Sequence, residues 1–484
     1  MLNNIFELIS HILFVISLAY YLITNLQWYN YKLKRVIFKH KKIHWHIIYF
    51  LLPIFAYMIF AINNHLFYFW IIFYLIYLPL LYLWQKKLDK PLKFTPKVKR
   101  LFFAVLLFTT ILDTLCIISI RCEHFSTFIP LILAFLSSYL YDKIEMRGFI
   151  NSAKDRLKEN PDLKIVAITA SYGKTSIKNF LYHILSKRFR VYKTPRSVNT
   201  LTGLIKDINE NLDSSYDFYI AEAGARERGD IDEIARFLNH DYAIVGSIGP
   251  AHIEYFKTLE NIRDTKMEIL NSKDLKRAFI HKSANVKADS RVKIYGDEIS
   301  NIKSTLDGIE FDLKIDDKIY HFKAPLLGKF NAINLSAAIL LSKEIGMKIE
   351  DIQKALLSIP QVEHRLQKIE AGGKLIIDDS FNGNFEGMSA SYKLVKEYQG
   401  RKVIITPGIV ESDKETNEKL AKLIDEVFDL VIITGSLNLE ILDKSIKRAK
   451  KIILKDKSNL ETLLAKETKS GDLILFSNDA PTFI

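Results

Sequence analysis

The first 145 residues carry five apolar stretches, and the rest of the chain has none of comparable length. The stretches cover residues 5–27, 45–62, 66–84, 101–120 and 125–141. About 20 apolar residues of helix cross the hydrocarbon core of a bilayer, so we expect five membrane helices followed by a globular part. The alternative for the shortest stretch, 125–141, is an interfacial position. A cleavable signal peptide is not expected, because no basic residue precedes the first stretch and Glu7 lies near its start.

Basic residues are concentrated in two of the connections between these stretches. They are Lys32, Lys34, Arg35, Lys39, Lys41 and Lys42 in the first, and Lys86, Lys87, Lys90, Lys93, Lys97, Lys99 and Arg100 in the third. Positively charged connections stay in the cytoplasm. An odd number of crossings then places the N-terminus outside and everything after residue 141 inside. The net charge of +13 therefore indicates a membrane and not nucleic acid as the partner.

Two further features of the apolar region have open interpretations. Asp113 lies inside the fourth stretch, and an intramembrane carboxylate is either functional or paired with another helix. The only cysteines are Cys116 and Cys122, from which we expect neither a disulfide framework nor a zinc site.

The remaining sequence alternates strand-like and helical patterns. Apolar runs typical of buried strands cover residues 164–168, 218–221, 242–247, 375–377, 403–406, 430–434, 451–454 and 473–476. Such alternation predicts parallel sheets with crossover helices, interrupted by a meander near residues 292–325. With a break near residues 359–360, we expect a membrane region at 1–145, a central α/β domain at 146–358 and a C-terminal α/β domain at 359–484.

The first of these strands leads into a loop typical of phosphate binding. It consists of Ala170, Ser171, Tyr172, Gly173, Lys174, Thr175 and Ser176, and a helical pattern follows. A helix N-terminus offers backbone N–H groups and a positive dipole end to an anion. Gly173 would let the backbone approach the phosphates, Lys174 would reach the terminal phosphates, and the Thr175 hydroxyl would bind magnesium.

An acidic residue and an imidazole follow two later strands. Glu222 comes directly after the strand at 218–221, and His252 follows the strand at 242–247. Ligands bind outside the carboxyl ends of strands in such sheets, which places both side chains to hold a metal that bridges ATP phosphates. Taken singly, Glu222 is also compatible with a surface charge, His252 with a loop residue and Lys266 with a solvated helix lysine.

The motifs together resemble those of the Mur ligase family over residues 160–484. The matching segments are a shortened phosphate loop at 170–175, Glu-x-Gly-Ala at 222–225, Gly-x-Ala-His-x-Glu at 249–254, Lys-x-Glu-Ile at 266–269, Asn-x-x-Asn-x-x-Ala-Ala at 331–338, His-Arg at 364–365 and an acidic, asparagine-rich segment at 378–384. The resemblance implies a P-loop-type central domain and a Rossmann-like C-terminal domain.

The resemblance also implies roles for individual residues. Lys174 and Thr175 resemble the contacts to ATP phosphate and magnesium, and Glu222 and His252 resemble metal ligands. Lys266 resembles a lysine that the family often carbamylates, which makes it an anionic magnesium ligand. Asn334 resembles an adenine-facing asparagine, Arg365 an arginine that reaches the γ-phosphate, and Asp379 a nucleotide contact of the C-terminal domain.

The resemblance implies an ATP- and Mg²⁺-dependent amide-bond ligase of peptidoglycan synthesis. It would add D-alanyl-D-alanine to UDP-MurNAc-tripeptide through an acyl phosphate, at the cytoplasmic face of the bacterial inner membrane. Further partners would be the lipid bilayer and other cell-wall enzymes, with no nucleic acid. The alternatives are a related ligase acting on another envelope polymer or a lipid-linked precursor, and a membrane ATPase or transport protein.

Two departures from the family pattern affect these expectations. Ala170 replaces the first glycine of the loop, so that position must avoid a backbone conformation that only glycine tolerates. Apolar stretches also occupy the place of the soluble N-terminal domain that usually holds the UDP end of the substrate.

Overall fold

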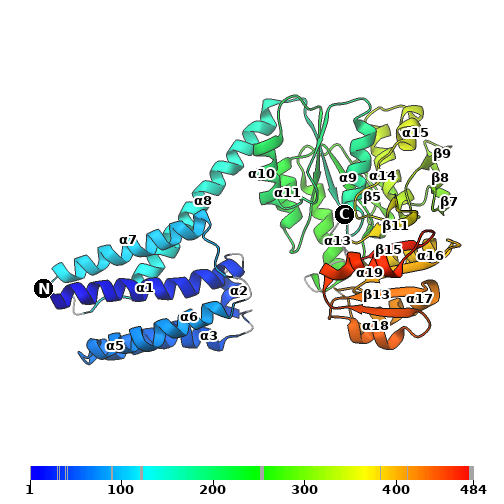
Figure 1. The fold of residues 1–484 in the computed structure, drawn as a ribbon. Helices are drawn as coiled ribbons and strands as arrows, with labels where there is room; N and C mark the ends of the chain where they lie inside the picture. Colours follow the sequence, from blue (N-terminus) through cyan, green and yellow to red (C-terminus); the bar gives the residue numbers. More distant parts are fainter. Residues whose placement is uncertain are drawn as a thin grey trace. The chain divides into compact units, whose positions relative to one another are not determined.

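The protein was analysed as a computed structural model that describes residues 2–29, 31, 33–38, 40, 42–88, 91–119, 124–250, 256–381, 383–410 and 412–478. They form two compact units, Met1–Gly148 and Phe149–Ile484, both drawn in Figure 1. The first unit is helical, and the second combines helices with largely parallel sheets. The predicted fold class is confirmed.

Long apolar helices make up the first unit (Figure 1). They are α1 (Leu2–Trp28), α2 (Leu33–Phe38), α3 (His44–His46) continued by a π-helical turn (Ile47–Leu51) and α4 (Leu52–Ile62), α5 (Leu66–Ile72) continued by a π-helical turn (Phe73–Tyr77) and α6 (Leu78–Lys86), α7 (Pro96–Ile118), and α8 (Phe128–Glu159). Helix α8 extends from the first unit into the second.

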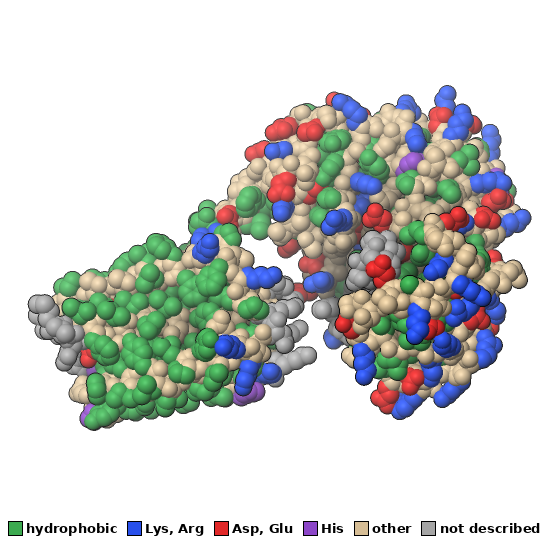
Figure 2. All heavy atoms as spheres, viewed as in Figure 1, with side chains coloured by type: hydrophobic (Ala, Val, Ile, Leu, Met, Phe, Trp, Pro, Cys, Tyr) green, Lys and Arg blue, Asp and Glu red, His purple; other side chains and the backbone are tan. Residues whose placement is uncertain are grey.

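Aromatic side chains fill the interior of this bundle. The ring of Phe14 lies 5.1 Å from that of Phe69, 5.5 Å from Phe73 and 5.6 Å from Tyr57, measured between centroids. The outer surface is apolar as well, and Figure 2 shows hydrophobic side chains over most of its visible face. A helix that is hydrophobic on all sides is typical of a membrane span.

Four helical segments are long and apolar enough to cross a membrane, where the sequence analysis predicted five. They are Ile5–Trp28, His44–Ile62, Leu66–Lys86 and Pro96–Ile118, among the residues that the structure describes. The predicted fifth span, 125–141, forms the first half of α8 and is not among them. Its apolar part begins only at Phe128, and charged residues follow from Asp142 onward.

The first half of α8 nevertheless packs antiparallel to α7. Asp142 of α8 lies 2.7 Å from Lys97 Nζ and 3.0 Å from Arg100 Nη2, both at the start of α7. Leu131 and Ala134, earlier in α8, are buried in the core of the bundle. The chain therefore returns along α8 to the end of the bundle that carries the basic connections.

Cys116, near the other end of α7, is disulfide-bonded. The sequence analysis expected no disulfide framework, and this single bond at Cys116 was not predicted. The second cysteine, Cys122, lies outside the described residues. Disulfides persist in oxidising compartments, and Cys116 is separated from the basic start of α7 by most of the length of that helix.

Asp113 is paired within the bundle, which is the second of the two interpretations of this residue. Its Oδ2 lies 2.7 Å from Nδ1 of His11 in α1, and both side chains are at most 1% exposed. The pair joins α1 to α7 through polar groups in a largely apolar core.

Replacing Asp113 with alanine should lower the melting temperature of the bundle, because His11 would lose its partner in a buried site, at a cost of ~1–3 kcal/mol. All four tryptophans, Trp28, Trp45, Trp70 and Trp84, lie in this unit, so tryptophan fluorescence follows its unfolding alone. Asp113→Asn keeps an oxygen acceptor for His11, so its melting temperature should fall less than that of Asp113→Ala. Equal melting temperatures for the wild type and both variants would show that the pair does not stabilise the bundle.

The second unit begins with a six-stranded parallel sheet. Its strands are β1 (Lys164–Thr169), β2 (Val191–Lys193), β3 (Phe218–Glu222), β4 (Tyr242–Val245), β5 (Arg277–His281) and β6 (Val292–Tyr295), in the order β2-β3-β1-β4-β5-β6. The accompanying helices are α9 (Lys174–Leu185), α10 (Leu201–Asn211), α11 (Asp230–Leu238), α13 (Leu259–Met267), α14 (Phe330–Glu344) and α15 (Ile349–Leu357). Because β1 lies between β3 and β4, the carboxyl ends of these three strands meet at one edge.

Two further sheets complete the unit. The predicted meander near residues 292–325 is confirmed for the antiparallel sheet β7 (Ile299–Thr305), β8 (Gly308–Ile315) and β9 (Lys318–Ala324), whereas residues 292–295 form β6 of the parallel sheet. The last sheet contains β10 (Gln367–Ala371), β11 (Lys374–Asp379), β12 (Lys402–Thr406), β13 (Leu430–Thr434), β14 (Lys450–Leu454) and β15 (Leu473–Ser477), in the order β10-β11-β15-β12-β13-β14, and only β10 is antiparallel. Its helices are α16 (Phe385–Lys396), α17 (Lys414–Val427), α18 (Leu439–Ser445) and α19 (Leu460–Glu467).

Separate hydrophobic cores lie beneath the two parallel sheets. One contains Val166, Ile220 and Ile244 of the first sheet, and another contains Ile404, Val431 and Leu475 of the last. The strand residues alternate between the two faces of each sheet and are buried on both, as expected for parallel strands covered by helices. The predicted domain boundary near residue 358 stays a prediction.

Candidate functional site

The loop after β1 joins the strand directly to α9. Gly173 caps the helix with φ = +83°, a left-handed conformation that residues with a Cβ rarely adopt. The amide of Asn334 in α14 packs against Gly173, where an added Cβ would collide with the amide oxygen. The first N–H groups of α9 have no partner within the helix, and its positive dipole end suits an anion.

Ala170, the departure from the family glycine, is fully buried. It is not among the residues with positive φ, so its backbone conformation is one that alanine tolerates, as the sequence analysis required. Its Cβ faces Gly246, where an added Cβ would lie 2.9 Å from Ala170 Cβ and 2.9 Å from Ile177 Cδ1. The methyl group of Ala170 thus fits only because Gly246, just after β4, has no side chain.

Gly246→Ala should therefore destabilise the second unit by ~1–3 kcal/mol, because the added methyl overpacks the contact between the loop and β4. Thermal unfolding followed by far-UV circular dichroism measures the loss. Ala170→Gly alone should be tolerated, and combined with Gly246→Ala it should restore part of the stability. A double variant as unstable as Gly246→Ala would contradict the packing described here.

Lys174 folds back over the loop that precedes it. Its Nζ donates to the carbonyl oxygen of Ala170 at 2.7 Å and to that of Ser171 at 3.4 Å. Burial lowers the pKa of this ammonium, the carboxylate of Glu222 opposes the shift, and the charge of Arg365 adds to it. A desolvated cation beside a helix N-terminus is a strong attractor for an anion.

Neighbouring loop residues attach the loop to the segment that follows β4. The Ser171 hydroxyl donates to Gly249 O at 2.9 Å, and the Ser171 and Tyr172 N–H groups donate to Ser247 O at 2.9 and 3.3 Å. Ser176, the last residue of the predicted set, is buried in the first turn of α9.

Glu222, at the end of β3, is 1% exposed, and both of its carboxylate oxygens contact donors. Its Oε2 accepts from Thr175 Oγ1 at 3.0 Å and lies 3.2 Å from Lys178 Nζ, and its Oε1 accepts from Asn199 Nδ2 at 3.2 Å. The surface-charge interpretation of Glu222 is therefore wrong. The structure brings together the hydroxyl and the carboxylate that the sequence analysis assigned to one metal.

Lys266, near the end of α13, is 4% exposed, so it is not a solvated helix lysine. Burial, and then the positive charge of Lys174, lower its pKa to about 7, against the opposing effect of the carboxylates of Asp230, Glu268 and Glu222. Its amine is therefore about half neutral at pH 7, which is the form that reacts with carbon dioxide.

The predicted metal set is incompletely described. His252 lies outside the described residues, and elsewhere in the described chain no three His, Cys, Asp or Glu side chains gather in a way that could hold a metal ion. Mg²⁺ prefers hard oxygen ligands, and the adjacent oxygens of Thr175 and Glu222 fit that preference. The complete set of Thr175, Glu222, His252 and Lys266 stays a prediction.

Residues in and around the first strands of the last sheet share the electrostatic environment of the loop. Arg365 donates from Nη1 to Phe381 O at 2.8 Å, and its guanidinium lies over the Phe381 ring. Burial lowers the pKa of Arg365, while the carboxylates of Asp379 and Glu222 raise it. Burial and the carboxylate of Glu386 raise the pKa of Tyr172 in the loop to about 12.

Asp379 and Asn334 occupy supporting positions. Asp379 accepts from Ser391 Oγ at 2.7 Å, and burial raises its pKa. Asn334 donates from Nδ2 to Asn331 Oδ1 at 3.3 Å and packs on Gly173. The structure thus places Asn334 at the phosphate loop, and its predicted contact with adenine stays a prediction.

Lys178 and Asn199 are site residues that the sequence analysis missed. Lys178 is 1% exposed and also donates to Arg196 O at 2.5 Å. It follows Lys174 by four positions, which puts both on one face of α9, so helical spacing could have identified it. No local sequence pattern identifies Asn199, because only the folded chain brings it within hydrogen-bond distance of Glu222.

Comparison with known proteins gives matches over the second unit. Residues 168–342 match the Mur ligase middle domain and residues 364–478 match the Mur ligase, glutamate ligase domain. The chain is 28% identical to the UDP-N-acetylmuramoyl-tripeptide–D-alanyl-D-alanine ligase of Borreliella burgdorferi over 59% of this chain. It is 26% identical to the Bacillus subtilis enzyme of the same name over 65% of this chain.

A solved structure has a similar fold over this region. The MurF ligase from Thermotoga maritima in complex with ADP superposes with a TM-score of 0.60 and 25% identity, over 69% of this chain and 80% of that one. The matched region spans just under two thirds of the Borreliella ligase, 65%, and 72% of the Bacillus enzyme. The two domain matches together cover more than half of the 484 residues, and the chain therefore belongs to the Mur ligase family.

Proposed function

We propose that this protein is an ATP-dependent amide-bond ligase that adds D-alanyl-D-alanine to UDP-MurNAc-tripeptide. The observation that carries the proposal is the phosphate loop: Thr175 Oγ1 donates to the buried Glu222 carboxylate at 3.0 Å, and the charges of Glu222 and of Arg365, from the segment before β10, both act on Lys174. The names of the relatives and the ADP in the solved neighbour support the same reaction.

In the proposed reaction, a substrate carboxylate oxygen attacks the γ-phosphorus of ATP and ADP leaves, which gives an acyl phosphate. The amine of the dipeptide then attacks the acyl carbon, phosphate leaves, and the amide forms. The N-terminus of α9 and Lys174 bind the phosphates. Arg365, from the C-terminal part, offsets charge on the transferred phosphoryl group.

Thr175 and Glu222 would hold Mg²⁺ together with His252 and a carbamylated Lys266. The ion supplies positive charge beside the phosphate oxygens. The buried, half-neutral amine of Lys266 supports the carbamate, because only an uncharged amine attacks carbon dioxide. Lys178 places a positive charge 3.2 Å from the Glu222 carboxylate.

The proposed location is the bacterial inner membrane, with the second unit in the cytoplasm. Four helical segments have the length and composition of membrane spans. The antiparallel return of α8, fixed by Asp142 on Lys97 and Arg100, supports a further crossing that brings the chain back to the side of the basic connections. The disulfide at Cys116 is consistent with an outer position for the opposite end.

The proposed function is tested with purified full-length protein, ATP, Mg²⁺, UDP-MurNAc-tripeptide and a panel of amines. Phosphate release and product mass are measured for D-alanyl-D-alanine, D-alanine and L-alanyl-L-alanine. We expect a product heavier by one condensed dipeptide with D-alanyl-D-alanine alone. Efficient product formation with another amine would overturn the assigned acceptor, and phosphate release without any acceptor would instead identify an ATPase.

A second candidate is a Mur-type ligase acting on a lipid-linked precursor or another envelope polymer. The apolar bundle of the first unit, which neither domain match reaches, favours a substrate held at a membrane. Turnover should be compared on the soluble nucleotide precursor and on its polyprenyl-linked form. A strong preference for the nucleotide would remove the lipid-linked candidate.

A further inference from the structure

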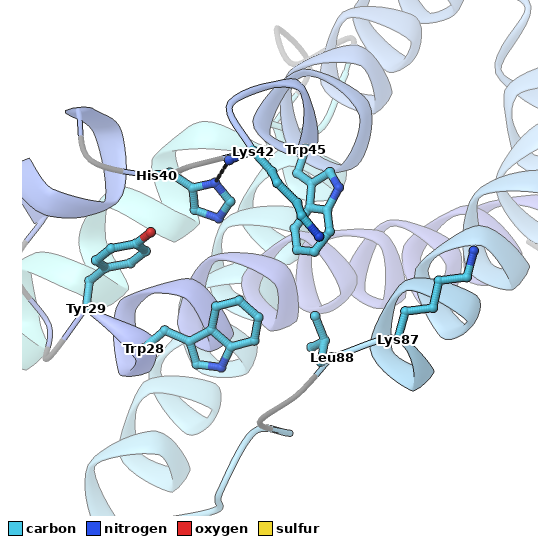
Figure 3. Close-up of a pocket in the computed structure, with 7 residues that line it drawn as sticks. All are labelled: Trp28, Tyr29, His40, Lys42, Trp45, Lys87 and Leu88. Atoms are coloured by element: carbon cyan, nitrogen blue, oxygen red, sulfur yellow. Dashed lines mark hydrogen bonds between the residues drawn. The ribbon is translucent and has the colours of Figure 1, made fainter. Parts of the chain in front are cut away.

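A pocket opens at the end of the helix bundle that carries the basic connections. It encloses about 190 Å³ and is lined by Trp28, Tyr29, His40, Lys42, Trp45, Lys87 and Leu88, drawn in Figure 3. The lining comes from the end of α1, the segment between α2 and α3, the first turn of α3 and the residues that follow α6. Three segments that are distant in the sequence therefore form one site.

The aromatic walls of this pocket are anchored in the bundle core. The Trp45 ring lies 5.8 Å from that of Trp84 and 5.9 Å from that of His40, between centroids. His40 is 7% exposed, and its ring nitrogens contact Asn25 Oδ1 at 2.9 Å and the Lys42 N–H at 3.0 Å. Since the Lys42 N–H donates to Nδ1, the imidazole is neutral and Nε2 donates to Asn25.

The end of α1 also contacts the third connection. Gln27 of α1 donates to Lys93 O at 2.8 Å and accepts from Lys93 N at 2.9 Å. These two hydrogen bonds attach Lys93 to the end of α1.

Positive charge in the pocket comes from Lys42 and Lys87. Lys42 Nζ lies 4.4 Å from the centroid of the Trp45 ring, and Figure 3 shows its side chain along that ring. In the described parts of the chain, neither lysine forms an ion pair with a carboxylate. Lys97 and Arg100 at the same end of the bundle differ, because both are paired with Asp142.

We infer that this pocket binds the phosphate-bearing headgroup of a membrane lipid. Two ammonium groups without a carboxylate partner in the described parts of the chain attract a phosphate, and basic pockets between membrane helices on the cytoplasmic side bind phospholipid headgroups. Tryptophan and tyrosine occupy the headgroup level of a bilayer, and the apolar outer faces of the flanking helices would contact the acyl chains. The volume is below the range of about 300–1,000 Å³ for drug-sized ligands, which suits a headgroup better than a nucleotide.

The inference rests on the proposed membrane location, and its test is independent of ligase activity. Full-length protein in detergent is titrated with dioleoyl phosphatidate, and native mass spectrometry counts the bound lipid. Oleate serves as an anionic lipid without phosphate, and inorganic pyrophosphate serves as a soluble competitor. Flotation with neutral vesicles tests membrane association separately, and Lys174→Ala should retain lipid binding.

The decisive comparison is between two double variants that each remove two positive charges. Lys42→Gln with Lys87→Gln should weaken phosphatidate binding at least tenfold. Lys93→Gln with Lys99→Gln, whose side chains are exposed at the same end and do not line the pocket, should leave it unchanged. Tryptophan fluorescence melting confirms that both variants fold.

Three results would overturn the inference. If both double variants weakened phosphatidate binding equally, the lipid would be attracted by the basic connections in general and not bound by the pocket. Oleate binding as tightly as phosphatidate would exclude recognition of phosphate. Pyrophosphate that displaces the lipid at equal concentration would identify a site for soluble anions in place of a lipid headgroup.

Discussion

Lys174→Ala is expected to lower turnover at least about a thousand-fold, the scale seen when a preorganised group that stabilises transition-state charge is removed. The ammonium lies at the start of α9 against the loop carbonyls, and no neighbouring described cation has the same placement. Phosphate release and product mass measure the loss under saturating ATP.

The same variant should fold at least as well as the wild type. Burial lowers the pKa of Lys174, which means that the folded protein holds this charge at a cost. Its melting temperature should therefore be unchanged or higher. Lys187→Ala, just beyond the end of α9 and exposed, is the matched control and should retain full activity. A Lys174→Ala protein with near-normal turnover would contradict the phosphate-loop assignment.

Lys266→Ala is expected to cause the second largest loss, about a hundredfold or more in turnover, because a magnesium ligand and a buried anion would both be missing. The more specific measurement is carbamylation itself. Protein incubated with ¹³C-bicarbonate should show one carbamate carbon signal by NMR in the wild type and none in Lys266→Ala. Lys273→Ala, an exposed lysine, is the control and should keep the signal.

The carbamate signal should also depend on pH in a defined direction. With a pKa of about 7, the neutral fraction of Lys266 rises from about a tenth at pH 6 to about nine tenths at pH 8, whereas an ordinary lysine stays below about 1% neutral throughout. The signal should grow over this range. A signal that persists in Lys266→Ala, or that falls as the pH rises, would rule out this lysine as the modified residue.

Local sequence signals were sufficient for the parts of the site that lie on regular elements. The apolar run of β1 followed by Gly173 and Lys174 predicted the strand, the loop and the helix start, and the position of Glu222 after its strand predicted its place beside Thr175. Three strands of the first sheet were not predicted as such. β2 has three residues and β5 five, and β6 was included in the predicted meander although it pairs in parallel with β5.

Other features depend on contacts between distant segments. Lys178 pairs with Glu222 across 44 residues of sequence, and His11 pairs with Asp113 between two helices. The sequence counted five apolar stretches, but the last is too short and too soon followed by charge to qualify as a span by its composition. That this stretch runs antiparallel to α7 is shown only by the ion pairs of Asp142 with Lys97 and Arg100.

Isotope transfer tests most directly whether a substrate carboxylate is phosphorylated during turnover. UDP-MurNAc-tripeptide labelled with ¹⁸O in its terminal carboxylate is incubated with the protein, ATP and D-alanyl-D-alanine, and the released phosphate is analysed by mass spectrometry. An acyl phosphate requires each phosphate to carry one ¹⁸O atom from the substrate. Phosphate released without ¹⁸O would mean that water attacks ATP, and the protein would then be an ATPase and not a ligase.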